Sequence, residues 1–394
     1  SRPITGSETF RPDVEGLRAV AVGLVLLFHS GIPGFDGGYV GVDVFFVLSG
    51  FLITGLLVRE IERTGTIRLG AFYARRIRRL LPATAVTLAG IAVLTIGTLP
   101  VIRWFSIGRD IQWAALYGVN WRFSSQAVDY LAAEEASSPL QHFWSLSVEE
   151  QFYFVWPFLL LLIARWAHRR SGNLRAAMLV GLAAVALPSL LWSAVLTSSE
   201  PGRAYFVTTT RVWELALGGL VALTAPYLSR LAKTGSALLA TAGIAGILIS
   251  AMTFGPTTAF PGTAALLPVT ATMAVIAAGI AHTDTLPGRF LGTPGMRKVG
   301  GLSYSLYLWH WPFVVAADAM FNGLTAIQGA AAVAVSVVPA VLTYNLVEKR
   351  WRHSSAFIDP VRRGIAIGIA LTAIGVIAGF ALIQAVPAVK VRDS

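Results

Sequence analysis

Long apolar segments constrain this sequence more than any other feature. Eleven such segments of about 20 residues occur along the 394 residues, and an α-helix of that length can cross the hydrocarbon core of a bilayer. Charged residues make up only 13% of the chain and hydrophobic residues 55%, which excludes a water-soluble globular protein. The predicted spans are 17–33, 39–58, 80–100, 145–164, 176–196, 208–227, 236–254, 263–281, 302–320, 325–347 and 364–386.

These spans predict an all-α polytopic membrane protein. The segment 107–121 is interrupted by polar residues, so we interpret it as an amphipathic helix on the surface. With the N-terminus in the cytoplasm, 24 of the 31 Lys and Arg residues fall in cytoplasmic segments and 7 lie on or near the outside, as the positive-inside rule requires. The prediction is a bundle of about 11 transmembrane helices, with a cytoplasmic N-terminus and an extracytoplasmic C-terminus.

The net charge of +11 is largely explained by this topology and does not indicate nucleic-acid binding. The chain has no cysteine, which excludes disulfides, thiolate metal sites and a cysteine nucleophile. The two histidines inside the predicted spans lack paired-ligand spacing on one helix, so we predict no metal site.

One cytoplasmic segment is denser in arginine than membrane anchoring requires. In RLGAFYARRIRRLLP, Arg75, Arg76, Arg78 and Arg79 form two overlapping R-x-x-R pairs at the start of a predicted helix. Guanidinium groups bind phosphate oxygens in bidentate fashion, which favours a phosphate-bearing ligand. Anchoring to lipid headgroups is an equally good interpretation.

Ionisable groups inside the membrane are costly and therefore point to function. Arg18 and His29 are eleven residues apart, almost three turns or about 16 Å along one helix face. His310 lies in the ninth span within the aromatic run YLWHWP. The alternative for His29 is a structural histidine that bridges two helices.

Carboxylates occur in several of the same spans. Asp43 lies near the outer end of the second span, and Glu149 and Glu150 enter the fourth from outside. Arg211 and Glu214 are three residues apart in the sixth span, where they could simply pair with each other. Unpaired buried acids would be neutral, so we expect ion pairs or a water-filled cavity.

This set of residues suggests acyl transfer across the membrane. A histidine can act as a general base on a hydroxyl, and a carboxylate can orient it and stabilise its charged form. A phosphate-rich donor bound by cytoplasmic arginines could reach up the Arg18–His29 face, while an acceptor enters from outside.

Six motifs, in order along most of the chain, resemble integral membrane acyltransferase family 3, the bacterial O-acyltransferases that modify cell-surface glycans and lipids. They are FRPDVEGLRAVAVGLVLLFH (10–29), GGYVGVDVFFVLSGFLIT (37–54), FYARRIRRLLP (72–82), SPLQHFWSLSVEEQFYFVWP (138–157), RVWELALGG (211–219) and LSYSLYLWHWP (302–312). Glu15 stands where many members have aspartate, a departure that keeps the charge.

The resemblance implies a cytoplasmic acyl-CoA donor, commonly acetyl-CoA, no tightly bound cofactor, and an extracytoplasmic glycan or glycolipid acceptor at the bacterial cytoplasmic membrane. It also implies that Arg18 and His29 are essential and that the four arginines of the R-x-x-R motif bind the donor's phosphates. We assign Arg18 to donor binding as well. We assign His29, Glu149 and Asp43 as catalytic. Contacts with the substrate are assigned to Glu150, Tyr153, Arg211 and His310.

The resemblance also predicts the domain organisation. Residues 1–350 form the acyltransferase domain with ten spans, and residues 351–394 supply an extra helix and an outer tail. In many members such a helix leads to an extracytoplasmic SGNH-type hydrolase-like domain. We therefore expect a domain of this kind, either as a continuation of the natural chain or as a separate partner.

The sequence leaves the route of the acyl group open. His29 could activate the acceptor directly, or the group could first rest on His29 or another side chain. Ser30 and Ser49 are candidates, although the SGF sequence at Ser49 favours helix packing. A transporter or flippase of an envelope lipid or glycan is the main rival function. A sensor that binds acyl-CoA without turnover is a third.

Overall fold

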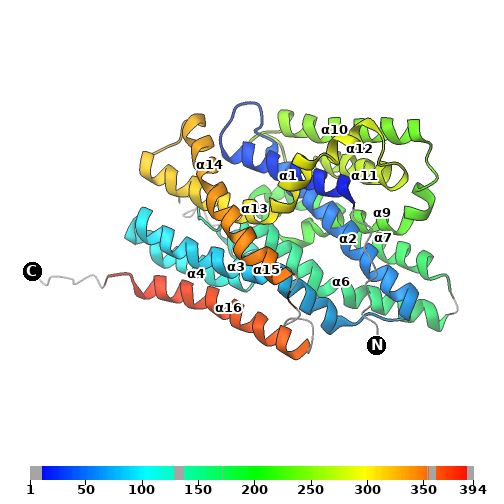
Figure 1. Cartoon of the computed structure of the whole chain (residues 1–394), viewed down its shortest axis with the longest axis horizontal. Helices are drawn as coiled ribbons and strands as arrows, with labels where there is room; N and C mark the ends of the chain where they lie inside the picture. Colours follow the sequence, from blue (N-terminus) through cyan, green and yellow to red (C-terminus); the bar gives the residue numbers. More distant parts are fainter. Residues whose placement is uncertain (1–10, 128–136, 171, 353, 355–360, 388–394) are drawn as a thin grey trace, which may run out of the picture.

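The computed structural model describes residues 11–127, 137–170, 172–352, 354 and 361–387, and all regular secondary structure in these ranges is helical (Figure 1). Eleven long helices correspond one to one with the predicted spans. They are α1 Pro12–His29, α2 Gly41–Thr64, α3 Leu69–Thr98, α6 Phe143–Arg169, α7 Leu174–Ser199, α9 Val212–Leu228, α10 Lys233–Thr253, α11 Leu266–Ala281, α13 Pro294–Phe321, α14 Ala326–Thr343 and α16 Val361–Gln384.

Shorter elements connect them. These are α4 Trp104–Ala115, α5 Val119–Gln126, α8 Pro201–Phe206, α12 Leu286–Leu291 and α15 Lys349–Arg352, the 3-10 turns η1 Gly38–Val40, η2 Val101–Arg103 and η3 Thr208–Thr210, and the π-helical turn η4 Tyr344–Glu348. The segment 107–121 falls on α4 and α5, which are separated at Tyr117, where φ is +52°. Twelve residues of α4 measure about 18 Å, too short to cross a bilayer core.

Seven helical stretches in the described ranges could cross a membrane by length and composition. They are Gly38–Thr64, Leu69–Thr98, Phe143–Arg169, Leu174–Ser199, Lys233–Thr253, Ala326–Arg352 and Val361–Gln384. Helices α9 and α11 are apolar but shorter, and α1 and α13 are interrupted by polar and charged residues. A multi-pass membrane protein is therefore confirmed, whereas the count of eleven spans and the orientation of the termini stay predictions.

Close approach of helix backbones sets the arrangement of the interior. A Cβ at Gly300 of α13 would lie 1.9 Å from the Glu15 carbonyl oxygen of α1, and one at Gly218 of α9 would lie 2.0 Å from the Val47 carbonyl oxygen of α2. A glycine at the contact lets the backbones of membrane helices approach this closely. Further along, His310 of α13 contacts His29 of α1, so these two helices run in the same direction. The first and ninth predicted spans, both odd-numbered, are expected to cross the membrane in the same direction.

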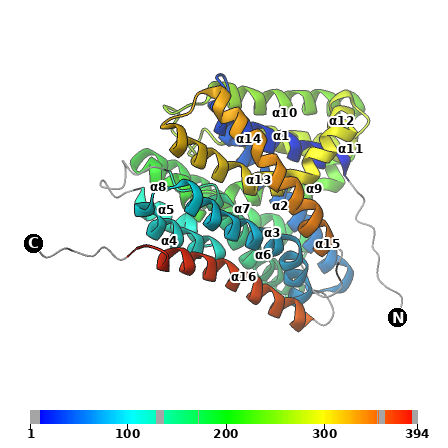
Figure 2. The same cartoon turned by 60° about the vertical axis from the view of Figure 1, so that its left-hand side comes forward.

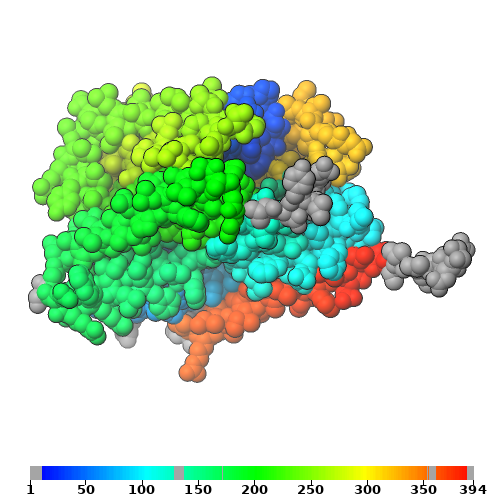
Figure 3. Space-filling view, turned by 180° about the vertical axis from the view of Figure 1, so that it is seen from behind, coloured from blue at the N-terminus to red at the C-terminus, as the bar shows by residue number. Residues whose placement is uncertain are grey.

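Helix α16 lies at the edge of the bundle beside α3 and α4, on the opposite side from α10 (Figures 1 and 2). Seen from behind, it runs along one border of the molecule with its outer side uncovered (Figure 3). Of the helices that carry predicted site residues, α3 packs against α16, whereas α1, α2, α6, α9 and α13 lie further inside the bundle.

Candidate active site

Three cavities follow one another through the bundle. We call them the arginine mouth, the central cavity and the histidine cavity. The central cavity shares Arg18, Leu52, Arg76 and Arg79 with the arginine mouth, and it shares Val42 and Tyr307 with the histidine cavity. Its volume is about 80 Å³, against about 790 Å³ for the mouth and 880 Å³ for the histidine cavity. A small central cavity, the waist, thus lies between two wide chambers.

Six arginines line the arginine mouth: Arg11, Arg18, Arg59, Arg76, Arg79 and Arg352. Two of them have a carboxylate partner in their own helix region, since Arg11 pairs with Asp13 at 2.6 Å and Arg18 contacts Glu15 at 3.7 Å. The surplus of positive charge makes this chamber suitable for a ligand with several phosphate groups.

Helix α3 divides the predicted arginine quartet between two faces. Arg76 and Arg79, three residues apart, line both the mouth and the central cavity. Arg75 instead lies 3.8 Å from the Glu60 carboxylate, and Arg78 donates to the Ser354 carbonyl at 3.2 Å. Residues i and i+3 share a helix face, so the motif presents one R-x-x-R pair to the cavities and turns the other away.

Helix α6 supplies the acidic wall of the central cavity. Glu149, Glu150 and Tyr153 line it, and the Glu149 carboxylate accepts hydrogen bonds from the hydroxyls of Ser49 and Tyr153. The guanidinium carbon of Arg76 lies 4.7 Å from the centroid of the Tyr153 ring, a cation–π distance. The predicted donor-binding and substrate-binding residues therefore meet at the waist.

The histidine cavity contains His29 at the last residue of α1. The helix ends there rather than at residue 33 as predicted, because Gly31 adopts a φ of +70°, a conformation that glycine tolerates without strain. The His29 Nδ1 atom lies 3.0 Å from Nε2 of His310, and the Trp311 ring lies 4.5 Å from the imidazole, centroid to centroid. Arg18 and His29 share α1 as predicted and line opposite ends of the row of cavities.

A third histidine, His142, belongs to this cluster and was not among the predicted site residues. Its ring lies 5.4 Å from that of His310, and its Nε2 donates to the Leu308 carbonyl at 3.0 Å. That carbonyl is available because Pro312, four residues later, has no N–H to complete the helix hydrogen bond. In the sequence, Pro312 signals that a helix carbonyl lacks its usual N–H donor. Only the fold reveals that His142 supplies the replacement.

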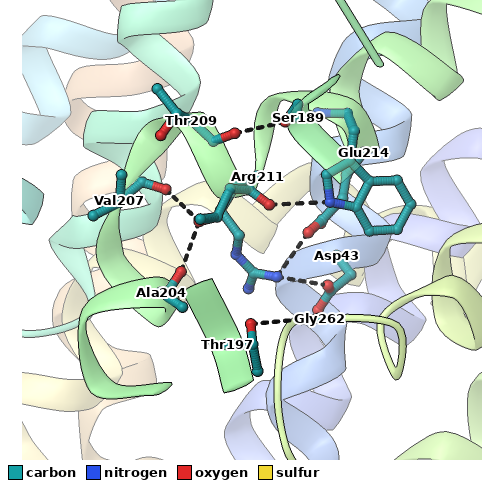
Figure 4. A network of polar contacts seen from close by, with 11 residues as sticks. Asp43, Ser189, Thr197, Ala204, Val207, Thr209, Arg211, Glu214 and Gly262 are labelled. Atoms are coloured by element: carbon teal, nitrogen blue, oxygen red, sulfur yellow. Dashed lines mark hydrogen bonds and ion pairs between the residues drawn. The ribbon is translucent and has the colours of Figure 1, made fainter. Parts of the chain in front are cut away.

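Asp43 and Arg211 lie elsewhere. The Arg211 guanidinium contacts Asp43 at 3.2 Å and Glu214 at 2.7 Å (Figure 4), and all three residues are fully buried. None of the three lines any of the three cavities. The expected pairing of Arg211 with Glu214 is confirmed, and the structure sets Asp43 against Arg211 instead of against the His29 ring.

Comparison with known sequences identifies the class of protein that carries this site. The sequence profile of family 3 acyltransferases, described as an acyltransferase domain, matches residues 11–345. The chain belongs to this acyltransferase family. No solved structure matches it.

Individual relatives of this chain extend the comparison. The peptidoglycan O-acetyltransferase OatA of Listeria monocytogenes is 33% identical over 78% of the chain and 50% of its own length. The O-acetyltransferase OatA of Staphylococcus aureus is 32% identical over 91% of the chain and 58% of its own length. The putative peptidoglycan O-acetyltransferase YrhL of Bacillus subtilis is 32% identical over 79% of the chain and 50% of its own length. The chain thus spans between half and three fifths of these relatives.

The side chains that line these cavities suit proton transfer and anion binding. Within the described residues, no group of three His, Asp or Glu side chains is arranged to hold a metal ion. What the cavities offer is two imidazoles, of His29 and His142, near one end, arginines at the other, and a carboxylate with two hydroxyl partners between them.

Proposed function

We propose that this acyltransferase moves an acyl group, acetyl in the first instance, from a cytoplasmic acyl-CoA to a hydroxyl of an extracytoplasmic cell-wall glycan. Its place would be the bacterial cytoplasmic membrane, with the arginine mouth facing the cytoplasm as the positive-inside rule predicts. The observation that carries the proposal is the row of cavities, because it links a phosphate-binding chamber to His29. The names of the relatives support the acetyl group and the glycan.

The donor would bind with its phosphates in the arginine mouth. Arg76 and Arg79 lie at the entrance to the waist, and Arg18 borders the same two cavities. The pantetheine arm of coenzyme A is long and narrow and carries the thioester away from the phosphates. The small central cavity of about 80 Å³ lies between the mouth and the histidine cavity, so the bulky nucleotide and its phosphates would stay on the cytoplasmic side.

The acceptor would occupy the histidine cavity. Tyr39, Trp144, Tyr205 and Trp311 line it, and such side chains combine an apolar ring with a hydrogen-bonding group. That combination suits a sugar, which has apolar ring faces and hydroxyl edges.

His29 would act as the general base of the transfer. It accepts the proton of the acceptor hydroxyl while the hydroxyl oxygen forms a bond to the thioester carbon. The carbon–sulfur bond then breaks, and the sulfur leaves as the thiol of coenzyme A after taking the proton from the imidazolium. The products are an O-acyl ester outside and free coenzyme A inside.

The test of the donor site uses two matched double substitutions on α3. Arg76→Gln/Arg79→Gln removes two charges from the cavity face, and Arg75→Gln/Arg78→Gln removes two charges from the other face of the same helix. In nanodiscs, we expect the first variant to bind acetyl-CoA at least tenfold more weakly, since charge-assisted hydrogen bonds contribute about 1.5–3 kcal/mol each. The second should bind like wild type. Equal effects of both pairs would contradict the proposed donor site.

The test of the chemistry is His29→Ala in the same nanodiscs. We expect donor binding to remain and acyl transfer to a glycan acceptor to fall by at least a hundredfold. Retained transfer would reject His29 as the base. Movement of a glycan or lipid across the membrane without a new ester bond would favour the rival transporter function.

A further inference from the structure

We propose that His310 is a positioning residue that holds His29 in the one tautomer able to act as a base toward the histidine cavity. This inference rests on the proposed function for its chemical meaning. Its geometry comes from α1 and α13 alone. It replaces the expected carboxylate partner of His29 with a second, neutral imidazole.

The first step fixes the proton of His310. Its Nδ1 lies 2.8 Å from the Tyr307 carbonyl oxygen and 3.2 Å from the Leu306 carbonyl oxygen, both in its own helix. A carbonyl oxygen only accepts hydrogen bonds, so Nδ1 must carry the hydrogen. Because both acceptors belong to α13 and the side chain is fully buried, the helix itself sets the direction of the ring.

The second step passes this constraint to His29. A neutral imidazole has one donor and one acceptor nitrogen, so the Nε2 of His310 is an acceptor. The nitrogen that faces it at 3.0 Å is Nδ1 of His29, which therefore carries a hydrogen. The remaining nitrogen of His29, Nε2, keeps its lone pair, and that lone pair is what a general base needs.

The third step concerns what surrounds the pair. Trp311 and Phe28 flank the His29 ring, with centroids at 4.5 Å and 4.8 Å, which limits its rotation. Across the described ranges, no carboxylate is hydrogen-bonded to this ring. An imidazole partner gives the ring orientation without placing a permanent charge in a membrane interior, where an ion is expensive. When His29 takes up a proton, its Nδ1–H still donates to His310.

Three substitutions of His310 distinguish a residue that accepts a hydrogen bond from His29 from one that only fills space. In His310→Gln, the side-chain oxygen can reach the place of the imidazole Nε2 and accept from His29. In His310→Asn, the amide ends near the place of Nδ1, so it can bond to the Tyr307 carbonyl but does not reach His29. His310→Leu fills space and accepts nothing. The control is His282→Gln, since His282 also contacts a backbone carbonyl, that of Leu231 at 3.1 Å, and lines none of the three cavities.

The experiment measures kcat, KM and acetyl-CoA binding for these variants in nanodiscs. We expect His310→Gln to keep kcat within about tenfold of wild type, and His310→Asn and His310→Leu to lose about a hundredfold or more, the contribution typical of general-base catalysis. Donor binding and the control should not change. Full activity of His310→Leu, or equal loss in all three folded variants, would overturn the inference.

A second measurement does not depend on activity or on any variant's folding. With ¹⁵N-labelled histidine in the wild-type protein, the nitrogen shifts of His29 should report a protonated Nδ1 and an unprotonated Nε2. The opposite tautomer would overturn the inference. If wild type shows the expected tautomer yet transfers no acyl group from acyl-CoA, the proposed function fails and the positioning of His29 by His310 stands.

Discussion

Two buried polar clusters lie among these helices, one around His29 and His310 and the other around Arg211. In the first, His29 borders a cavity of about 880 Å³, and its partner His310 can be a neutral imidazole. In the second, Asp43, Arg211 and Glu214 are fully buried, and one oxygen of each carboxylate has no hydrogen-bond partner. Both would be costly inside a membrane. The two clusters differ in accessibility. A substrate in the histidine cavity could contact His29, whereas Asp43, Arg211 and Glu214 line none of the three cavities and contact only protein groups.

The Arg211 cluster has a structural use that explains its cost. The guanidinium carbon lies between four aromatic rings, with centroids 5.1–5.8 Å away, and three of these, from Trp144, Tyr205 and Phe260, also line the histidine cavity. The cluster thus supports one wall of the cavity from behind. Its loss should affect folding first and chemistry second.

The largest effect is expected from a substitution that disrupts the Arg211 cluster. Arg211→Met leaves two buried carboxylates without a counter-ion, and we expect it to lower the free energy of unfolding by about 3–5 kcal/mol. Removing all three charges, as Arg211→Met/Asp43→Asn/Glu214→Gln, should recover most of that loss, because no unpaired charge remains. Thermal unfolding in detergent and the yield of monodisperse protein measure both. If the triple variant folds but transfers no acyl group, the distinction between the two clusters is wrong.

The next effect tests the waist. Tyr153→Phe keeps the ring under Arg76 and removes the hydroxyl that donates to Glu149. Since hydrogen bonds to charged groups contribute about 1.5–3 kcal/mol, we expect kcat/KM to fall about tenfold or more. The control is Tyr73→Phe, whose hydroxyl bonds to the Phe154 carbonyl at 2.7 Å outside the three cavities. An equal loss in both variants would indicate a packing effect between α3 and α6.

Much of the fold could be predicted from the sequence, because apolar length is a local property. Each of the eleven predicted spans falls on a long helix. The boundaries were less accurate where helices begin in polar sequence. Helix α3 starts at Leu69, eleven residues before the predicted span, since its first turns carry the arginines that an apolar window rejects. Helix α1 likewise starts at Pro12 and ends at His29.

Several of the residues predicted from the sequence line the cavities, but how they are grouped could not be predicted. Arg18, Arg76, Glu149 and His29 all line the connected cavities. The partner of His29, by contrast, lies 281 residues away on α13, and no spacing rule connects the two. Spacing alone also gave no reason to separate Asp43 from the catalytic group, because burial beside Arg211 depends on how α2 packs on α9.

A smaller effect concerns His142, which links the histidine cluster to the kink in α13. His142→Phe should leave the buried Leu308 carbonyl without a donor and cost about 1–3 kcal/mol of stability. Adding Pro312→Ala supplies a backbone N–H four residues after Leu308 and should recover part of this loss. Thermal unfolding of both single variants and the double variant measures the coupling. Strictly additive changes would mean that the carbonyl does not connect the two residues.

The smallest effect is expected at an ion pair that resembles the Arg211 cluster in chemistry and differs in burial. Lys233 hydrogen-bonds Asp284, and both side chains are 55% exposed. That hydrogen bond holds the pKa of the Asp284 carboxyl below its usual value. A lowered folded-state pKa stabilises the protein above the unfolded pKa, and this stabilisation is lost as the pH falls through the folded pKa. Water and salt screen exposed ion pairs. We therefore expect Lys233→Gln to lower the midpoint temperature of unfolding at neutral pH by less than about 2 °C. At a pH low enough to protonate Asp284, wild type and variant should unfold at the same temperature. If Lys233→Gln lowered the unfolding midpoint as much as Arg211→Met, the loss of stability at both sites would depend on the lost charge and not on its burial.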